Sequence, residues 1–264
     1  MNFAEVPRIG QGSWNVELDD RAATVAALRA GVDAGLTHID TAELYGGGYA
    51  EEVIAEALAD RREQLFLVSK VMPSNASRHG TVTACERSLQ RLRTDRLDCY
   101  LLHWPGSEPL EDTFAAFEEL RAAGKIRSYG VSNFSEELLR EAVRIAGAGK
   151  IACNQVLYNL GERHIESKLI PACRALGIAV VGYSPFMDFE ESPALRAVAT
   201  ELGATTRQVA LAFLARNALQ IPKASRAEHV RDNAGALSLS LSADQIARIS
   251  QAYPLKVRRQ LPTA

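Results

Sequence analysis

The sequence alternates short apolar segments with segments of helical periodicity from one end to the other. Eight segments rich in β-branched and other apolar residues are predicted strands: 8–12, 36–40, 65–70, 97–102, 127–132, 151–156, 178–182 and 219–222. Between them, apolar residues recur at helical spacing, as Val25, Leu28 and Val32 do. A strand followed by a helix, repeated eight times, favours parallel strands covered by helices.

The number of repeats indicates how such a sheet closes. Eight strand–helix units within 264 residues match the usual size of a closed (β/α)8 TIM barrel. No linker or shift in composition divides the chain, so we expect residues 1–264 to form a single domain. A doubly wound open sheet is the alternative. It is disfavoured because Gly10-Gln11-Gly12 is only a fragment of the glycine-rich fingerprint expected after its first strand.

Residues at the ends of the helical segments agree with this division. Ser225 precedes Glu228 by three residues, and Ser242 precedes Gln245 in the same way, which is the spacing of a capping box. Glycines suited to a left-handed helix end stand before three of the strands, at Gly35, Gly124 and Gly177.

Composition excludes several classes of protein. A formal charge of −2 gives no basic surface for nucleic acid or anionic lipid, and no apolar run approaches the roughly 20 residues that span a bilayer. The N-terminus lacks the pattern of a secretory signal. The four cysteines have no C-x-x-C spacing, so we expect free thiols in a reducing cytoplasm. No apolar interface stripe is evident, and a monomer is the default expectation.

Polar or aromatic residues follow nearly every predicted strand, at the end where a barrel of this type carries its active site. From the second strand to the eighth they are Asp40 and Tyr45, Lys70, His103 and Trp104, Ser132 and Asn133, Asn154 and Gln155, Tyr183 and Ser184, and Lys223. A purely structural barrel would not need such residues at seven consecutive strand ends. The pattern therefore predicts one functional rim.

Four of these residues suit the delivery of a proton to a carbonyl oxygen during hydride transfer. A phenol such as Tyr45, with a reference pKa of about 10, is a proton donor at neutral pH, and a neighbouring Lys70 ammonium is expected to lower that pKa. Asp40 would keep Lys70 charged, and His103 would hydrogen-bond the substrate oxygen. Taken singly, Asp40 could instead cap a turn, Lys70 could be solvated and His103 could be a core histidine.

A metal-dependent barrel hydrolase or isomerase is a second enzyme class. It would need several histidines and carboxylates on one ion, but only His103 and Asp40 qualify at the rim. No metal site is predicted.

Several motifs together resemble the aldo-keto reductase family. They are Gly10-Gln11-Gly12-Ser13-Trp14, the segment from His38 to Gly46, Val68-Ser69-Lys70, Leu101-Leu102-His103-Trp104-Pro105, Gly124-Lys125-Ile126-Arg127, Gly130-Val131-Ser132-Asn133-Phe134, Asn154-Gln155-Val156, Tyr183-Ser184-Pro185 and Ile221-Pro222-Lys223-Ala224-Ser225. They run in family order over nearly the whole chain. The sequence is most similar to small bacterial members that reduce aldehydes and dicarbonyls such as methylglyoxal.

The resemblance implies the function of each motif residue. It implies a catalytic tetrad of Asp40, Tyr45, Lys70 and His103 with Tyr45 as general acid, and a small carbonyl substrate between Trp14 and Trp104. It also implies an extended nicotinamide cofactor, NADPH with NADH as the alternative, held by Ser132, Asn133 and Gln155 at the carboxamide, Tyr183 and Ser184 at the ring, Lys223, Ser225 and Arg226 at the ribose phosphate, and Asn233 at the adenine.

Some positions depart from the family pattern. Ala224, His229 and Asp232 stand where many members have Ser, Arg and Glu, although Lys223 and Arg226 still favour the 2′-phosphate of NADPH. The N-terminus before Gly10 is short, so the hairpin that often plugs the barrel is expected to be reduced or absent.

The loops that set specificity in the family, here 106–109, 187–192 and 253–264, are also short. Short loops predict an open pocket for a range of small aldehydes. A non-catalytic subunit that senses nicotinamide redox state is the alternative function.

Overall fold

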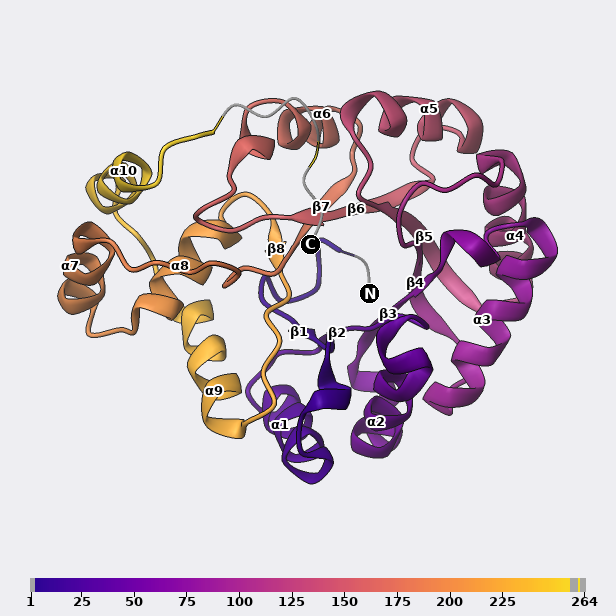
Figure 1. Cartoon of the computed structure of the whole chain (residues 1–264), viewed down its shortest axis with the longest axis horizontal. Coiled ribbons are helices and arrows are strands. Elements are labelled where there is room, and N and C mark those ends of the chain that lie inside the picture. The colour runs from indigo at the N-terminus through magenta and orange to yellow at the C-terminus, as the bar shows by residue number, and fades with distance from the viewer. Residues whose placement is uncertain (1–2, 257–260, 262–264) are drawn as a thin grey trace.

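The computed structural model describes residues 3–256 and residue 261, and its strands form one eight-stranded sheet. All neighbouring strands are parallel and follow one another in chain order (Figure 1). The strands are β1 (Gln11–Gly12), β2 (His38–Asp40), β3 (Phe66–Val71), β4 (Leu97–Leu102), β5 (Ile126–Ser132), β6 (Ile151–Leu157), β7 (Ala179–Tyr183) and β8 (Leu219–Gln220).

The last strand meets the first, which closes the sheet into a barrel. Parallel bridges join Ile9 to Gln220 and Gly12 to Lys223, and the Gly10 N–H donates to the Gln220 carbonyl at 2.8 Å. The (β/α)8 barrel is therefore confirmed, and the open doubly wound alternative is wrong. The first and last strands are shorter than the sequence predicted, and the segments that contain them meet through isolated bridges rather than a continuous ladder.

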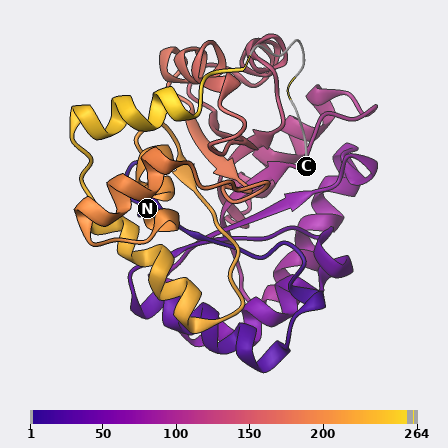
Figure 2. The same cartoon turned by 60° about the vertical axis from the view of Figure 1, so that its left-hand side comes forward.

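Helices surround the strands on the outside (Figure 1). They are α1 (Arg21–Asp33), α2 (Tyr49–Leu58), α3 (Arg78–Leu92), α4 (Leu110–Ala122), α5 (Glu136–Ala146), α6 (Leu169–Ala175), α7 (Pro193–Leu202), α8 (Thr206–Ala215), α9 (Ala227–Gly235) and α10 (Ala243–Ala252), with short 3-10 turns η1 (Val16–Leu18), η2 (Tyr45–Gly48), η3 (Ala59–Gln64), η4 (Pro73–Asn75), η5 (His164–Glu166) and η6 (Ala236–Ser238). Two helices, α7 and α8, separate β7 from β8, and α10 packs against α7 on the same side (Figure 2).

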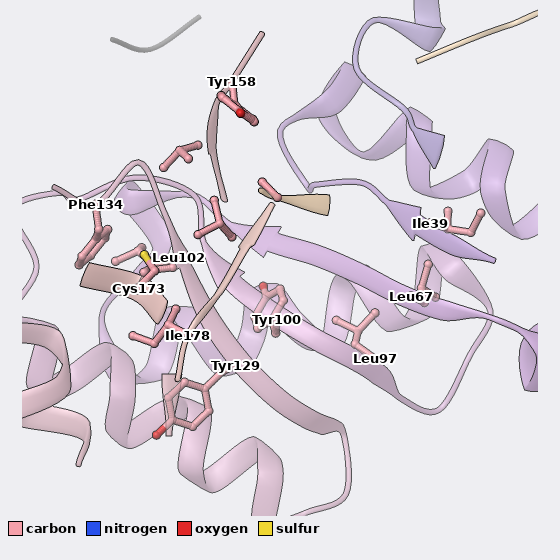
Figure 3. Packing of buried hydrophobic residues seen from close by; sticks show 14 of the residues in the cluster. Ile39, Leu67, Leu97, Tyr100, Leu102, Tyr129, Phe134, Tyr158, Cys173 and Ile178 are labelled. Carbon is pink, nitrogen blue, oxygen red and sulfur yellow. The ribbon is translucent and has the colours of Figure 1, made fainter. Parts of the chain in front are cut away.

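Successive strand residues face opposite ways, which divides the core into two parts. Phe66 and Val68 of β3 point into the barrel, where they pack with other strand residues in one buried cluster. Leu67 between them belongs to the larger cluster that lies between strands and helices. Figure 3 shows this outer cluster, with Tyr100 of β4 and Tyr129 of β5 under the covering helices. The inward row thus carries either apolar filling or, at the strand ends, the polar residues of the rim.

Most of the expected helix ends are confirmed. Ser242 and Gln245 form the capping box of α10. The three glycines that follow helices have left-handed backbones, with φ of 89° at Gly35, 73° at Gly124 and 69° at Gly177. The capping box expected at Ser225 is wrong. α9 starts at Ala227, one residue later than that box implies, with Arg226 as N-cap and no side-chain hydrogen bond to the N–H groups of its first turn.

Side chains of residues 3–6 pack inside the barrel. Residues 3–8 form turns and contain no strand. Phe3 lies edge-on to Phe66 with ring centroids 4.8 Å apart, and Val6 is buried in the inner cluster. Two apolar side chains of this segment therefore contribute to the filling of the barrel.

The structure also describes the state of the cysteines and the character of the helices. The cysteines are buried free thiols, at Cys85, Cys99, Cys153 and Cys173. Within residues 3–256, none of the helices has the length and apolar character required to cross a membrane.

Candidate active site

A cavity of about 510 Å³ opens at the carboxyl ends of the strands. It is lined by Gly12, Ser13, Trp14, Asp40, Leu44, Tyr45, His103, Trp104, Pro105, Ser132, Asn133, Gln155, Tyr183, Ser184, Ile221 and Lys223. Ten of the residues singled out from the sequence lie on its wall together with Lys223, while Lys70 lies beneath the floor. The single rim expected from the sequence is therefore present.

Lys70 joins the residues on the cavity floor. Its side chain is fully buried, and its Nζ donates to Asp40 Oδ1 at 2.5 Å, to the Thr41 carbonyl at 2.8 Å and to the Tyr45 hydroxyl at 3.1 Å. These three acceptors use all three N–H groups of the ammonium. The geometry fixes the ammonium between a carboxylate and a phenol.

Asp40 is held from two more directions. The Gln155 amide Nε2 donates to Asp40 Oδ2 at 2.7 Å, and the Ser13 hydroxyl donates to the Asp40 carbonyl at 2.9 Å. The carboxylate therefore has a partner on each oxygen although it is only 1% exposed. The sequence associated Gln155 with a cofactor carboxamide, whereas the structure shows its amide N–H on the tetrad carboxylate.

Tyr45 reaches the floor because of the turn that follows it. Gly46, Gly47 and Gly48 have φ of 57°, 64° and 100°, a left-handed run that residues with a Cβ adopt only at a cost. The turn leaves the Tyr45 ring 8% exposed, edge-on to Trp14 with ring centroids 5.0 Å apart. The triple glycine, which reads as a simple loop in the sequence, thus positions the phenol.

The electrostatics of the pair differ in one respect from expectation. Burial alone would lower the pKa of Lys70, but the charge of Asp40 and the phenol of Tyr45 outweigh it and raise that pKa, so the ammonium stays charged. Burial raises the pKa of Tyr45, and the opposing charge of Lys70 does not cancel the rise. Lys70 does act to lower the Tyr45 pKa as expected, but desolvation of the buried phenolate has the larger effect, so the pKa in the free protein is raised. The phenol is protonated at neutral pH.

His103 completes the tetrad beside Tyr45. The two rings lie edge-on with centroids 5.6 Å apart, and Trp104 packs on the other side at 4.8 Å. Burial and the nearby charge of Lys70 lower the pKa of His103 to about 2. The imidazole is therefore neutral and can offer one N–H to an oxygen in the cavity.

The ends of β5 and β7 form a second polar group on the cavity wall. The Tyr183 hydroxyl donates to Asn133 Oδ1 at 2.9 Å, and Asn133 Nδ2 donates to the His103 carbonyl at 3.2 Å. Asn133 and Ser184 both have left-handed backbones, with φ of 61° and 52°. Such strained positions persist where the surrounding contacts hold them, and they concentrate at functional sites.

The residues assigned to the far end of the cofactor are more dispersed. Lys223 lines the cavity and forms an ion pair with Asp19. Ser225, Arg226 and Asn233 lie beyond the cavity, at or before the start of α9 and within it. Asn233 is 5% exposed, so it is largely covered in the free protein.

The sequence did not assign a function to several cavity residues. Ser13, Leu44, Pro105 and Ile221 stood in quoted motifs without an assigned role. Each lies within two residues of a predicted strand end or rim residue, so the rim pattern itself was the available signal. Among the described residues, no three His, Cys, Asp or Glu side chains are grouped as a metal site would require.

Comparison with known proteins agrees with this geometry. The family model described as the aldo/keto reductase family matches residues 8–254. The chain is 44% identical over 260 residues to methylglyoxal reductase YeaE of Escherichia coli, covering 94% of this chain and 92% of that protein. It is 32% identical to a glyoxal reductase of Bacillus subtilis, over 94% of this chain and 89% of that protein.

Solved structures give the same result. An aldo/keto reductase from Klebsiella pneumoniae in complex with NADP and acetate superimposes with a TM-score of 0.93 at 43% identity, over 98% of this chain and 96% of that one. A second structure, of an aldo-keto reductase from the same organism in complex with NADPH, gives the same score and identity over 98% of this chain and 95% of that one. The resemblance noted in the motifs is confirmed: the chain belongs to the aldo/keto reductase family of oxidoreductases.

Proposed function

We propose that this protein reduces small aldehydes and α-dicarbonyls, such as methylglyoxal, to alcohols, with NADPH as the hydride donor and Tyr45 as the proton donor. The observation that carries the proposal is the buried contact of Lys70 Nζ with both Asp40 and the Tyr45 hydroxyl at the cavity floor. A charged ammonium fixed against a protonated phenol is an arrangement for releasing that phenol's proton on demand.

The protein residues supply the proton as follows. As negative charge develops on the carbonyl oxygen, the neutral His103 imidazole donates a hydrogen bond to it and fixes its direction. Tyr45 then transfers its proton to that oxygen. Lys70 stabilises the resulting phenolate, and Asp40, held by Gln155, keeps Lys70 in place. Burial keeps the phenol protonated until the substrate oxygen needs the proton.

The cavity fits a nicotinamide dinucleotide along its other wall. When bound, the nicotinamide supplies the hydride. Tyr183 offers an aromatic face for the ring, and Ser132 and Asn133 offer polar groups beside it. Lys223 lines the same cavity, and the start of α9 beyond it has backbone N–H groups without a side-chain cap, a suitable place for a phosphate.

The entrance favours small substrates. Trp14 is 49% exposed and Trp104 is 36% exposed at the cavity mouth, so aromatic surface is available with little loop cover. The similar proteins named methylglyoxal reductase and glyoxal reductase support dicarbonyls as the substrate class. Bulky substrates would gain few contacts in so open a site.

The test is NADPH oxidation with a panel of small aldehydes, dicarbonyls and ketones, for wild type and Tyr45→Phe. We expect Tyr45→Phe to lower kcat by about 10²–10⁴-fold, the usual contribution of general acid catalysis, while the Kd for NADPH stays the same. Tyr49→Phe is the matched control. Tyr49 lies on α2, where its ring packs under the guanidinium of Arg21 from α1, outside the cavity. Equal oxidation by wild type and Tyr45→Phe would refute Tyr45 as the proton donor, and no oxidation by wild type with any carbonyl would leave only a nicotinamide-binding function. A steroid turned over better than any small aldehyde would refute the substrate class.

A further inference from the structure

We propose that Asp19 is a specificity-determining residue that weakens the preference for NADPH over NADH, by competing with the 2′-phosphate for Lys223. The inference rests on the proposed function, since it concerns the dinucleotide that the cavity takes. The Asp19 carboxylate faces Lys223 in the free protein.

The backbone brings the two side chains together where the barrel closes. Asp19 follows η1 and directly precedes Asp20, the N-cap of α1, and Lys223 follows β8. A parallel bridge joins Gly12 to Lys223, and the Gly12 N–H donates to the Pro222 carbonyl at 3.0 Å. The segments after β1 and after β8 are thus anchored side by side, and the Asp19 carboxylate contacts the Lys223 ammonium.

The pair determines the charge at this end of the cavity. Among the described residues that line the cavity, Lys223 alone carries a full positive charge, since His103 is neutral. The Lys223 and Asp19 side chains are 30% and 25% exposed, so water screens their attraction only in part. With Asp19 in place, the ammonium already has a counter-ion. An incoming phosphate dianion must separate the pair and then remain close to a carboxylate.

The free energy needed to separate Lys223 from Asp19 opposes the binding of NADPH more than that of NADH. NADPH brings the 2′-phosphate and meets the full repulsion of Asp19, whereas NADH brings a neutral 2′-hydroxyl. A carboxylate accepts hydrogen bonds from ribose hydroxyls, which is how acidic residues favour NADH in other dinucleotide sites. Asp19 therefore acts against NADPH and leaves NADH unaffected or slightly favoured. Arg226, the N-cap of α9 beyond the cavity, is a second cation that can attract the phosphate, and the carboxylate of Asp19 contacts Lys223 instead.

The direct test is Asp19→Asn, which keeps the size of the side chain and removes its charge. The Kd values for NADPH and NADH are measured at low salt by quenching of tryptophan fluorescence, since Trp14 lies at the cavity wall. We expect the Kd for NADPH to fall by about 2- to 5-fold, the upper part of the range for a partly exposed ion pair. The Kd for NADH should change by less than about 2-fold on the same grounds. The gain for NADPH should shrink at high salt.

Asp60→Asn is the matched control, because Asp60 is an exposed carboxylate paired with Arg29 outside the cavity. It makes the same change in net charge, and both Kd values should stay at the wild-type level. A double-mutant cycle adds a second measurement: in a Lys223→Met background, Asp19→Asn should tighten NADPH by less than it does with Lys223 present, because only the repulsion between Asp19 and the phosphate is then removed.

The Kd values distinguish a function of Asp19 in cofactor preference from a purely structural one. If Asp19→Asn raises the Kd values for NADPH and NADH equally, the ion pair supports binding of both dinucleotides without distinguishing them, and the inference is wrong. If neither Kd changes, Asp19 does not control the site, while the proposed function stands. If wild type binds neither dinucleotide, the proposed function fails together with this inference.

Discussion

His38 gives a prediction about stability that follows from burial alone. The side chain is 0% exposed inside the barrel, with its ring edge-on to Phe66 at 5.5 Å and to Phe3 at 5.9 Å. Neither ring nitrogen has a hydrogen-bond partner among the described residues. Burial lowers the pKa of His38 from 6.5 to about 4, against a smaller opposing effect of Asp40. The folded protein therefore holds this histidine neutral.

The sign of the pH dependence follows from comparing the two states. Below pH 6.5 the unfolded chain binds a proton at His38 that the folded protein does not bind until about pH 4. Stability is therefore complete above 6.5, falls as the pH falls, and levels off below about 4. The whole loss is about 3.4 kcal/mol, and the part between pH 7 and pH 5 is about 1.8 kcal/mol. His103 adds a loss of the same sign in every variant that keeps it.

His38→Leu isolates the contribution of this one group. Leucine has a similar size and no ionisable atom, so the variant should lose about 1.8 kcal/mol less than wild type between pH 7 and pH 5. Urea unfolding followed by far-ultraviolet circular dichroism at the two pH values measures the difference. His79→Leu is the control, since His79 lies exposed on α3 and its replacement should leave the wild-type pH dependence. If His38→Leu loses as much stability as wild type over this range, with equal m-values, the argument from burial is refuted.

Three further predictions concern the tetrad. Lys70→Met removes the cation from the phenol and leaves the Asp40 carboxylate buried without a charge partner, so kcat should fall by about 10²-fold or more, and urea unfolding should show a loss of about 3–5 kcal/mol. Because the pKa of His103 is lowered to about 2, the pH profile of kcat/KM for aldehyde reduction should have no inflection near pH 6.5, and one there would contradict a neutral His103. Gln155→Leu removes the hydrogen bond to Asp40 Oδ2, so steady-state kcat/KM should fall by about 10-fold while Tyr45 remains in place, whereas unchanged kinetics would deny Gln155 a positioning role.

The fold was predictable because its signal is repeated. Each of the eight strand–helix units presents the same alternation, so an error at one boundary does not change the architecture. The gathering of Asp40, Tyr45, Lys70 and His103 at the rim was predictable for the same reason, since the carboxyl ends of all strands in a barrel meet at one face.

Other features depend on distances that the sequence does not contain. Gln155 and Asp40 are separated by 115 positions, and only the closed barrel shows that the amide reaches the carboxylate. The direction of the Tyr45 pKa depends on how far burial outweighs Lys70, a balance of two opposing effects. The missing cap at Ser225 arises because α9 starts one residue later than its sequence pattern suggests.

The barrel is held together most weakly where β1 meets β8, and we call this place the joint. Each is two residues long, while β4 and β5 are six and seven residues long. Local opening at this joint would part Trp14 from Lys223 and leave Lys70 on β3 undisturbed. A ligand that contacts both sides of the joint would hold it closed, with a gain of about 2.7 kcal/mol at a hundredfold excess over Kd. Resistance to proteases in a cell would then depend on how much dinucleotide the cell contains.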